Sequence, residues 1–262
     1  MGERKKVESG VKLMGMGASF GLCVWNVMWA KAGTERGEAV RGRLGERGFD
    51  VICLTEGTAG VLPEGGCVID SDPDYGYRMI EGRRKVLLWS RRPWREVDRV
   101  GNPRMPGGRF VSGVTETPAG DVRFVGVCIP WDLAHVNTGR KDRAKWEDHM
   151  RYLEGLEEYS GGLAGRERED GQRVPIVLAG DFNQTIPRTR ARVDVYEALM
   201  RALRGWDVVT AGLGGIDHVA LSGGLRALRI ERWAAEYGGG KGVSDHAGVE
   251  VEVGWSEGMG RR

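Results

Sequence analysis

The chain has 262 residues, of which 40% are apolar, and this is enough for one large α/β domain with a sizeable core. Its 39 Lys and Arg nearly balance its 37 Asp and Glu. This balance argues against a nucleic-acid coat protein, whose affinity depends on a strong basic excess, but not against an enzyme that contacts a few phosphates. No apolar run approaches the roughly 18 residues that would suggest a membrane span.

The first ten residues form a segment that is polar and basic overall, and no apolar stretch with a small-residue cleavage site follows it. We therefore expect a cytoplasmic protein. Three of the four cysteines, Cys23, Cys53 and Cys128, lie within apolar runs, and no Cys-x-x-Cys pair occurs. This predicts buried thiols that act as small apolar groups, rather than a zinc site or a disulfide framework. The ligands of any metal should then be oxygens.

Short apolar runs rich in Val, Ile and Leu predict strands along the chain. They lie at residues 22–30, 51–54, 86–89, 122–129 and 176–179. Continuous runs of this length are typical of strands that are covered on both faces. Near the end of the chain, Val249, Val251 and Val253 alternate with polar residues, which predicts a half-exposed strand.

Helical spacing of apolar residues predicts two helices between these strands, at residues 141–158 and 190–204. Residues 34–47 are a third helix candidate, although this segment contains three glycines. Residues 161–173 are rich in glycine and charge, which predicts a surface loop.

No break in composition is deep enough to mark a domain boundary. We expect one domain over residues 21–254, in which helices cover β-sheets, with a flexible segment before it (1–20) and a short tail after it (255–262).

Two segments combine an acid with a second polar group at the end of a predicted strand. In the sequence Gly-Asp-Phe-Asn, Asp181 and Asn183 follow an apolar run at a glycine-assisted turn. An ordinary turn, in which Asp and Asn bond their own backbone, would give the same pattern. In the sequence Ser-Asp-His, Asp245 and His246 precede the last strand. A surface Asp-His pair is the alternative there.

Three more polar residues interrupt or border apolar runs. Asp217 opens a strand, Glu56 closes one, and Asn26 lies within one. A buried amide left without partners costs about 1–3 kcal/mol, so Asn26 requires partners. Glu56 and Asp181 each end a strand, and open α/β sheets bind ligands at the carboxyl ends of their strands. Each segment alone has a structural explanation, but one structural explanation for all five is strained.

In this order, the five segments resemble the endonuclease/exonuclease/phosphatase superfamily, which has the deoxyribonuclease I fold, over residues 23–253. Gly-Asp-Phe-Asn and Ser-Asp-His are the most specific markers. The resemblance implies an α/β fold, a two-sheet sandwich flanked by helices in four layers (α/β/β/α). It also implies a site for Mg²⁺, with Mn²⁺ as an alternative ion, in which Glu56 binds the cation and Asn26 and Asp245 lie beside it.

The resemblance further implies the roles of the remaining residues. Asp181, fixed by Asn183, would orient and deprotonate the attacking water, and His246, paired with Asp217, would stabilise the charge that builds on the phosphate. Elementary chemistry agrees with these roles. Mg²⁺ prefers oxygen ligands, and a neighbouring carboxylate raises the pKa of a histidine and so favours its charged form.

The chain departs from the family pattern before its long helix, where relatives often carry a His-Leu pair. Here we expect His135 to contact the substrate phosphate and Asp132 to orient it, with a loop histidine of no special role as the alternative. The basic residues at 138–143 suit a phosphate approach or a solvated face. We expect His149 on the surface and His218 packed within its strand.

Together these features predict a Mg²⁺-dependent phosphodiesterase that acts on nucleic acid as an endonuclease or exonuclease. A phosphatase or phosphodiesterase of inositol phosphates or phospholipid head groups is the alternative within the superfamily. A catalytically silent binding module on the same fold is a third reading, against which the intact Asp181 and His246 argue. Basic segments at residues 83–85, 91–94 and 188–190 could contact a nucleic-acid backbone or could be solvated turns.

Overall fold

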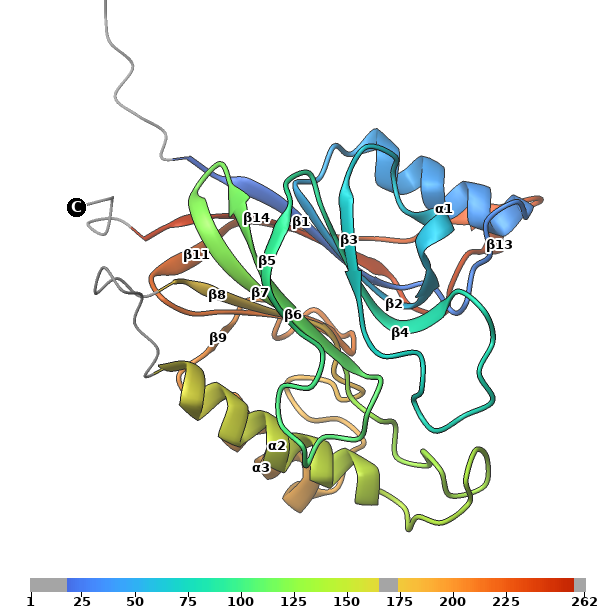
Figure 1. The fold of residues 1–262 in the computed structure, drawn as a ribbon, viewed down its shortest axis with the longest axis vertical. Helices are drawn as coiled ribbons and strands as arrows, with labels where there is room; N and C mark the ends of the chain where they lie inside the picture. The colour runs from blue at the N-terminus through green and yellow to red at the C-terminus, as the bar shows by residue number, and fades with distance from the viewer. Residues whose placement is uncertain (1–17, 165–173, 257–262) are drawn as a thin grey trace, which may run out of the picture.

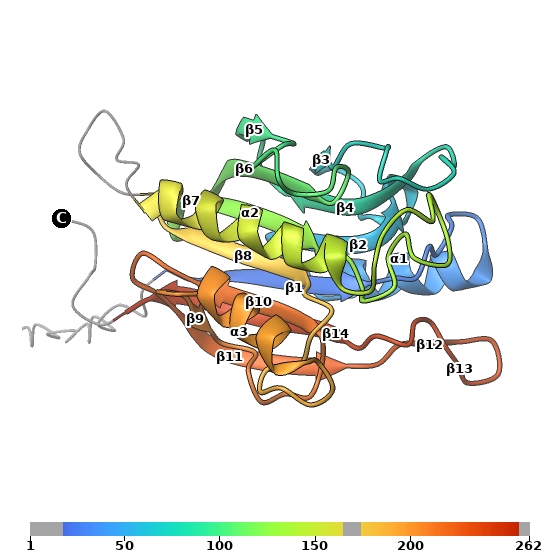
Figure 2. The ribbon, with the colours of Figure 1, turned by 90° about the horizontal axis from the view of Figure 1, so that it is seen from below.

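Two six-stranded β-sheets lie face to face, and helices cover their outer faces (Figures 1 and 2). The computed structural model describes residues 18–164 and 174–256. The four-layer α/β/β/α sandwich predicted from the sequence is therefore confirmed. Residues 1–17, 257–262 and 165–173, on which the predicted terminal segments and most of the predicted loop fall, lie outside the described residues.

The first sheet has the strand order β11-β14-β1-β2-β4-β3. Its strands are β1 (Phe20–Asn26), β2 (Val51–Thr58), β3 (Cys67–Asp70), β4 (Arg83–Ser90), β11 (Leu225–Trp233) and β14 (Gly248–Trp255). Strands β1 and β2 are parallel, and the other pairs are antiparallel. In β14 the predicted alternation is confirmed, because Val249, Val251 and Val253 are buried while Glu250 and Glu252 are half-buried.

The second sheet has the order β5-β6-β7-β8-β10-β9. Its strands are β5 (Trp94–Asp98), β6 (Phe110–Thr117), β7 (Gly120–Cys128), β8 (Ile176–Asp181), β9 (Asp207–Val208) and β10 (Asp217–Leu221). A small hairpin joins β12 (Glu236–Tyr237) and β13 (Lys241–Gly242). Strand β6 was not predicted, because it contains Ser112, Gly113 and Thr115 at buried positions and so has no continuous apolar run.

Helix α1 (Glu35–Glu46) covers the first sheet, as predicted for residues 34–47. Thr34 caps its first turn, since the Thr34 hydroxyl accepts a hydrogen bond of 3.1 Å from the backbone N–H of Gly37. A Cβ atom at Gly37 would lie 1.9 Å from the carbonyl oxygen of Lys31, so this glycine allows the helix to approach the preceding loop. Val40 and Leu44 pack against the sheet. A single 3₁₀ turn, η1 (Ala59–Val61), follows β2.

Helices α2 (Glu147–Ala164) and α3 (Val193–Ala202) cover the second sheet (Figure 2). Both were predicted, but α2 begins later and continues through residues 161–164, which were predicted as loop. The helix continues there because Leu163 packs into the core between α2 and the sheet. The prediction of a surface His149 was also wrong. His149 is fully buried, with Nδ1 2.6 Å from the Pro130 carbonyl oxygen and Nε2 2.8 Å from the Gln184 amide nitrogen.

The fold brings polar strand ends together at one rim of the sandwich. Asn26 at the end of β1 is paired in register with Thr55 of β2, one residue before Glu56. In the other sheet, Asp181 at the end of β8 is paired with Asp217 at the start of β10. No helix in the described part of the chain is long and apolar enough to cross a membrane.

Candidate active site

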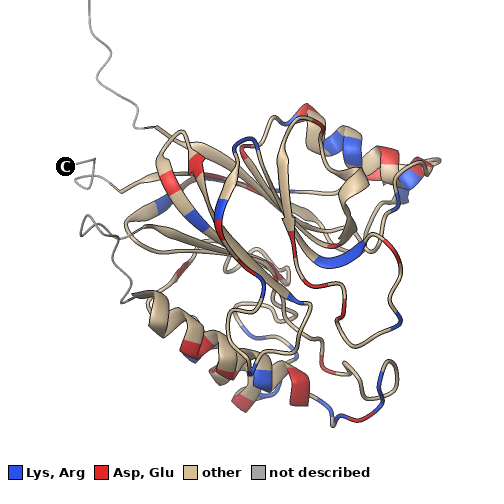
Figure 3. Ribbon diagram, viewed as in Figure 1, with Lys and Arg blue, Asp and Glu red and all other residues tan. Residues whose placement is uncertain are grey.

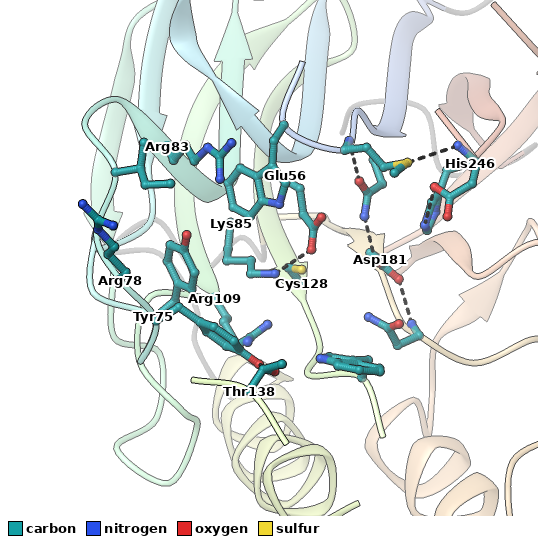
Figure 4. Close-up of a pocket in the computed structure, with 18 residues that line it drawn as sticks. Glu56, Tyr75, Arg78, Arg83, Lys85, Arg109, Cys128, Thr138, Asp181 and His246 are labelled. Carbon is teal, nitrogen blue, oxygen red and sulfur yellow. Dashed lines mark hydrogen bonds and ion pairs between the residues drawn. The ribbon is translucent and has the colours of Figure 1, made fainter. Parts of the chain in front are cut away.

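A cavity of about 540 Å³ opens at this rim and draws its lining from both sheets (Figure 4). Six of the seven residues that the sequence marks as the catalytic and metal-binding set line it: Asn26, Glu56, Asp181, Asn183, Asp245 and His246. The seventh, Asp217, lies behind His246 and is bonded to it. Segments that are far apart in the sequence therefore meet at one hollow.

The turn after β8 holds Asp181 in a fixed, buried position. Gly180 has a φ of 141°, and a Cβ atom there would lie 1.9 Å from the carbonyl oxygen of Val127 in β7, so only glycine fits. The Asp181 side chain is buried and accepts two hydrogen bonds. One comes from Asn26 Nδ2 at 3.0 Å and the other from the backbone N–H of Asn183 at 2.9 Å.

The Asn183 side chain is anchored to Ile129, the residue that follows β7. Its Nδ2 donates to the carbonyl oxygen of Ile129 at 2.7 Å, and its backbone N–H, rather than its side chain, holds Asp181. Asn183 and Glu56 both have positive φ angles, 54° and 50°. Such conformations cost non-glycine residues of order 1–3 kcal/mol and are concentrated at functional sites.

His246 lies just before β14 of the first sheet, and its side chain is held by Asp217 at the start of β10 in the second sheet. Its Nδ1 lies 2.5 Å from Oδ2 of Asp217. Its backbone is fixed on both sides, because its N–H donates to the Ser244 hydroxyl at 3.1 Å and its carbonyl oxygen accepts from Trp25 Nε1 at 3.0 Å. Ser244 in turn donates to the carbonyl oxygen of Asn26 at 2.7 Å. The imidazole therefore has one orientation, with Nε2 left for a ligand.

The environment raises the pKa values of both His246 and Asp181, which suits the first to donate a proton and the second to accept one. Burial disfavours the charged form of His246, but the hydrogen bond that its ring donates to Asp217 and the charges of Asp217, Asp181 and Asp245 outweigh it and raise the pKa of His246 to about 9. Burial, together with the charge of Asp217, raises the pKa of Asp181 to about 7 despite the hydrogen bonds it accepts. At neutral pH the cavity thus presents an imidazolium beside a carboxylate with a near-neutral pKa.

Two groups of side chains have the donor atoms for a divalent cation. In the first, one ligand atom each from Asp181, Asp217 and His246 lie within 4.8 Å of one another. In this group, however, His246 Nδ1 and Asp217 Oδ2 are already bonded to each other, and the pKa near 9 keeps a proton on the ring at neutral pH. A protonated imidazole has no lone pair for a metal.

The second group consists of oxygen donors around Glu56. The ammonium nitrogen of Lys85 lies 2.5 Å from Glu56 Oε1, so a cation already occupies part of this carboxylate. Asn26 Oδ1 accepts one hydrogen bond, from the Met28 N–H at 2.9 Å, and keeps a second lone pair. One carboxylate and an amide oxygen fit Mg²⁺, which binds through few protein oxygens. Asp245 is farther out, with a side chain that is 70% exposed and an Oδ1 that is 3.7 Å from His246 Nε2.

The structure places His135 outside the cavity lining and corrects its predicted partner. His135 is buried, and its Nδ1 lies 2.6 Å from Oδ2 of Asp148, whose Oδ1 accepts from Arg143 Nε at 2.9 Å. Asp132 instead pairs with Lys145 at 3.1 Å. The carboxylate that orients His135 is therefore Asp148, which the first turn of α2 brings back against the preceding loop.

One side of the cavity is a wall of aromatic and basic side chains, which was not identified from the sequence. The rings of Trp29 and Tyr75 are stacked with their centres 5.8 Å apart. The Lys85 ammonium lies 5.2 Å and 5.4 Å from these two ring centres, and the Arg83 guanidinium lies 4.9 Å from that of Trp29. These are cation–π distances. In the sequence, only the basic residues at 83–85 pointed to this wall, and their pattern fits a solvated turn equally well.

Behind the wall, His135 supports a second tyrosine. The rings of Tyr77 and His135 are 4.6 Å apart, and the Tyr77 hydroxyl lies 3.3 Å from the His135 backbone N–H and 3.4 Å from the Thr138 hydroxyl. Of the other basic segments, 91–94 is bonded through Arg91 to the carbonyl oxygen of Phe49, away from the cavity. His218 is packed inside, as predicted, between the Thr210 hydroxyl and the Gln184 carbonyl oxygen.

Comparison with known proteins agrees with this geometry. The sequence profile described as Endonuclease/Exonuclease/phosphatase family matches residues 23–246. Among solved structures, a 3′-5′ exonuclease from Neisseria meningitidis has a TM-score of 0.62 at 18% identity, with 90% of this chain and 100% of that one covered. No curated protein matches.

Two further solved structures are similar. A 3′ phosphatase from Neisseria bound to a product DNA hairpin has a TM-score of 0.61 at 16% identity, over 90% of this chain and 100% of the other. An AP endonuclease from Archaeoglobus fulgidus has a TM-score of 0.61 at 17% identity, over 88% and 98%. At these identities the structural likeness shows the fold alone.

Proposed function

The chain belongs to the endonuclease/exonuclease/phosphatase family, whose members hydrolyse phosphoesters, and from this premise we propose that it is a metal-dependent phosphodiesterase acting on nucleic acid. One observation carries the proposal. In a single cavity, a buried carboxylate with a pKa of about 7, Asp181, lies near an imidazole with a pKa of about 9, His246. Two titratable groups whose environments suit opposite protonation states are typical of an acid–base catalytic site.

Asp181 is the general base in this proposal. Its carboxylate is held from two sides by Asn26 Nδ2 and the Asn183 N–H, and it accepts a proton from the water that attacks phosphorus. A pKa near the working pH is favourable for such a base, because the group is both ionised and basic enough to take the proton.

His246 faces the charge that grows on the phosphoryl group. Its Nδ1 is bonded to Asp217, so the protonated ring can donate from Nε2 to a non-bridging oxygen. A preformed donor of this kind stabilises the transition state more than the ground state. A divalent cation bound through Glu56 and Asn26 would add Lewis-acid neutralisation of the same phosphoryl charge.

The aromatic and basic wall supports nucleic acid as the substrate. The half-buried ring of Trp29, stacked on the buried ring of Tyr75, offers a flat apolar surface on which a base can stack, and Lys85 and Arg83 lie beside it. The similar 3′ phosphatase from Neisseria was solved with a DNA product. The same concentration of cations favours, as a second candidate, a small molecule with several phosphates, such as an inositol phosphate or a phospholipid head group.

A hydrolysis panel tests the proposal. Single- and double-stranded DNA, abasic DNA, RNA, inositol phosphates and sphingomyelin are incubated with wild type and with Asp181→Ala, in Mg²⁺, in Mn²⁺ and in chelator. We expect cleavage of a nucleic acid that requires both the metal and Asp181. Cleavage of inositol phosphate or sphingomyelin alone would favour the second candidate, and no metal-dependent cleavage by wild type would leave a non-catalytic binding module.

A further inference from the structure

A buried arginine in the cavity has no ion-pair partner among the residues that the structure describes. Arg109 is only 1% exposed, and its Nε and Nη2 atoms have no hydrogen-bond partner anywhere in residues 18–164 and 174–256. It nevertheless lines the cavity. Removing a charged group from water without a partner is costly, so a buried and unpaired guanidinium indicates a missing anion.

The register of the second sheet places Arg109 in line with the proposed base. The Arg109 carbonyl oxygen accepts from the N–H of Cys128 at 3.0 Å, and Cys128 is paired in turn with Asp181 across β7 and β8. Directly opposed residues point to the same face of a sheet, and all three residues line the cavity. Two inter-strand spacings separate Arg109 from Asp181, which is about 10 Å between Cα atoms.

Other cations lie on the same side of the cavity. Figure 4 shows Arg109, Lys85, Arg83 and Arg78 on one side of Glu56, with Asp181 and His246 on the other. Over the whole ribbon, by contrast, acidic and basic residues are interspersed (Figure 3). The positive charge is therefore concentrated on one side of the cavity, next to Asp181 and His246 but separate from them.

We propose that Arg109 and Lys85 form a second anion-binding subsite, which takes a terminal phosphate monoester on the same molecule as the phosphodiester that is cleaved. The substrate is then a phosphorylated end of a nucleotide chain, with its terminal base on the Trp29 ring. The guanidinium supplies forked N–H donors that match phosphate oxygens, and the Lys85 ammonium supplies a point charge. The inference rests on the proposed function for the position of the cleaved bond, but not for the anion site itself.

Binding without turnover tests the subsite. Pyrophosphate is titrated into the metal-free protein, in chelator, by isothermal titration calorimetry. We expect wild type and Asp181→Ala to bind it and Arg109→Met to bind at least tenfold more weakly. Arg151→Met, which removes one exposed arginine from α2, is the matched control for net charge and should bind like wild type. Equal binding by Arg109→Met and wild type would overturn the proposal.

A second variant covers the possibility that Arg109→Met does not fold. Lys85→Met is expected to weaken pyrophosphate binding by a similar factor, and unchanged binding in that variant would also overturn the proposal. Thermal unfolding checks folding directly. Arg109→Met should melt at the same or a higher temperature than wild type, because it removes a buried charge whose Nε and Nη2 atoms have no hydrogen-bond partner among the described residues.

Turnover separates this inference from the proposed function. A dinucleotide with a terminal phosphate, at the 5′ or the 3′ end, is compared with the same dinucleotide without it. We expect wild type to prefer one phosphorylated form at least tenfold in kcat/KM, and Arg109→Met to lose that preference. Cleavage with no preference would contradict the proposed subsite but not the proposed hydrolase function. No cleavage, together with Arg109-dependent pyrophosphate binding, would contradict the proposed hydrolase function but support the anion-binding site.

Discussion

His246 and Asp217, 29 residues apart in the sequence, share a hydrogen bond of 2.5 Å between Nδ1 and Oδ2. The bond joins the loop before β14 to the first residue of β10, and thus links the two sheets across the rim of the sandwich. It fixes both the orientation and the charge of the imidazole. A histidine held in this way is expected to stay protonated well above the pKa of a free side chain.

Asp217→Asn tests this link through the pH dependence of turnover. If the imidazolium is the active form, kcat/KM of wild type falls as pH rises through about 9, the raised pKa of His246. In Asp217→Asn the main cause of that rise is lost, so the fall should move down toward 6.5, the ordinary pKa of a histidine. The measurement is kcat/KM from pH 5 to 10 at saturating Mg²⁺. The same alkaline fall in both proteins would contradict the role of Asp217.

Asp181→Asn should lower turnover by a factor on the order of 10²–10⁴ while the protein stays folded, because the general base is lost. It should also change the pH dependence of stability. The folded pKa of Asp181, about 7, lies above the ordinary value of 3.8 for an aspartate, so wild type loses stability as pH rises between these values. The variant lacks this loss. Melting temperatures measured in chelator should therefore diverge, in favour of the variant, from pH 4 to pH 7, and parallel curves would contradict the shifted pKa.

Glu56→Gln should weaken Mg²⁺ binding at least tenfold, because the amide removes the charge of the proposed ligand. Lys85→Met should have the opposite effect, since it removes the ammonium that lies 2.5 Å from the same carboxylate. Isothermal titration of Mg²⁺ into the three proteins measures both effects without turnover. Unchanged Mg²⁺ affinity in Glu56→Gln would place the cation elsewhere, with the group of Asp181, Asp217 and His246 as the remaining candidate.

Gly180→Ala should destabilise the protein by about 2 kcal/mol or more, because its Cβ would lie 1.9 Å from the Val127 carbonyl oxygen. Urea denaturation in chelator measures the change. Gly161→Ala is the matched control. It lies within α2 with nothing within 4 Å of its added Cβ, and alanine there should stabilise the helix by about 0.5–1 kcal/mol. If both variants have the stability of wild type, β7 and β8 do not constrain the turn.

Local residue patterns were enough to predict the main strands and the three helices, whereas the four-layer fold was predicted from the resemblance to the family. A continuous apolar run such as residues 176–179 is typical of a strand that is covered on both faces. An acid that follows the run then lies at the end of the strand, on the rim of the sheet. Strands that lack such a run escaped prediction. In β6, small polar residues fill buried positions, and in β11, at the edge of the sheet, an arginine at every third position interrupts the apolar residues. Their pairing partners, rather than their own composition, make them strands.

The candidate site divides in the same way. The sequence by itself determined which residue types stand at the strand ends, and the order of Asn26, Glu56, Asp181, Asp217 and His246 indicated the family. Only the tertiary structure decided which groups touch. It pairs His135 with Asp148 instead of Asp132, buries His149 on the inner face of α2, and sets Arg109 unpaired in line with Asp181. The physical reason is that these contacts depend on register and packing between segments distant in the chain, which local periodicity does not specify.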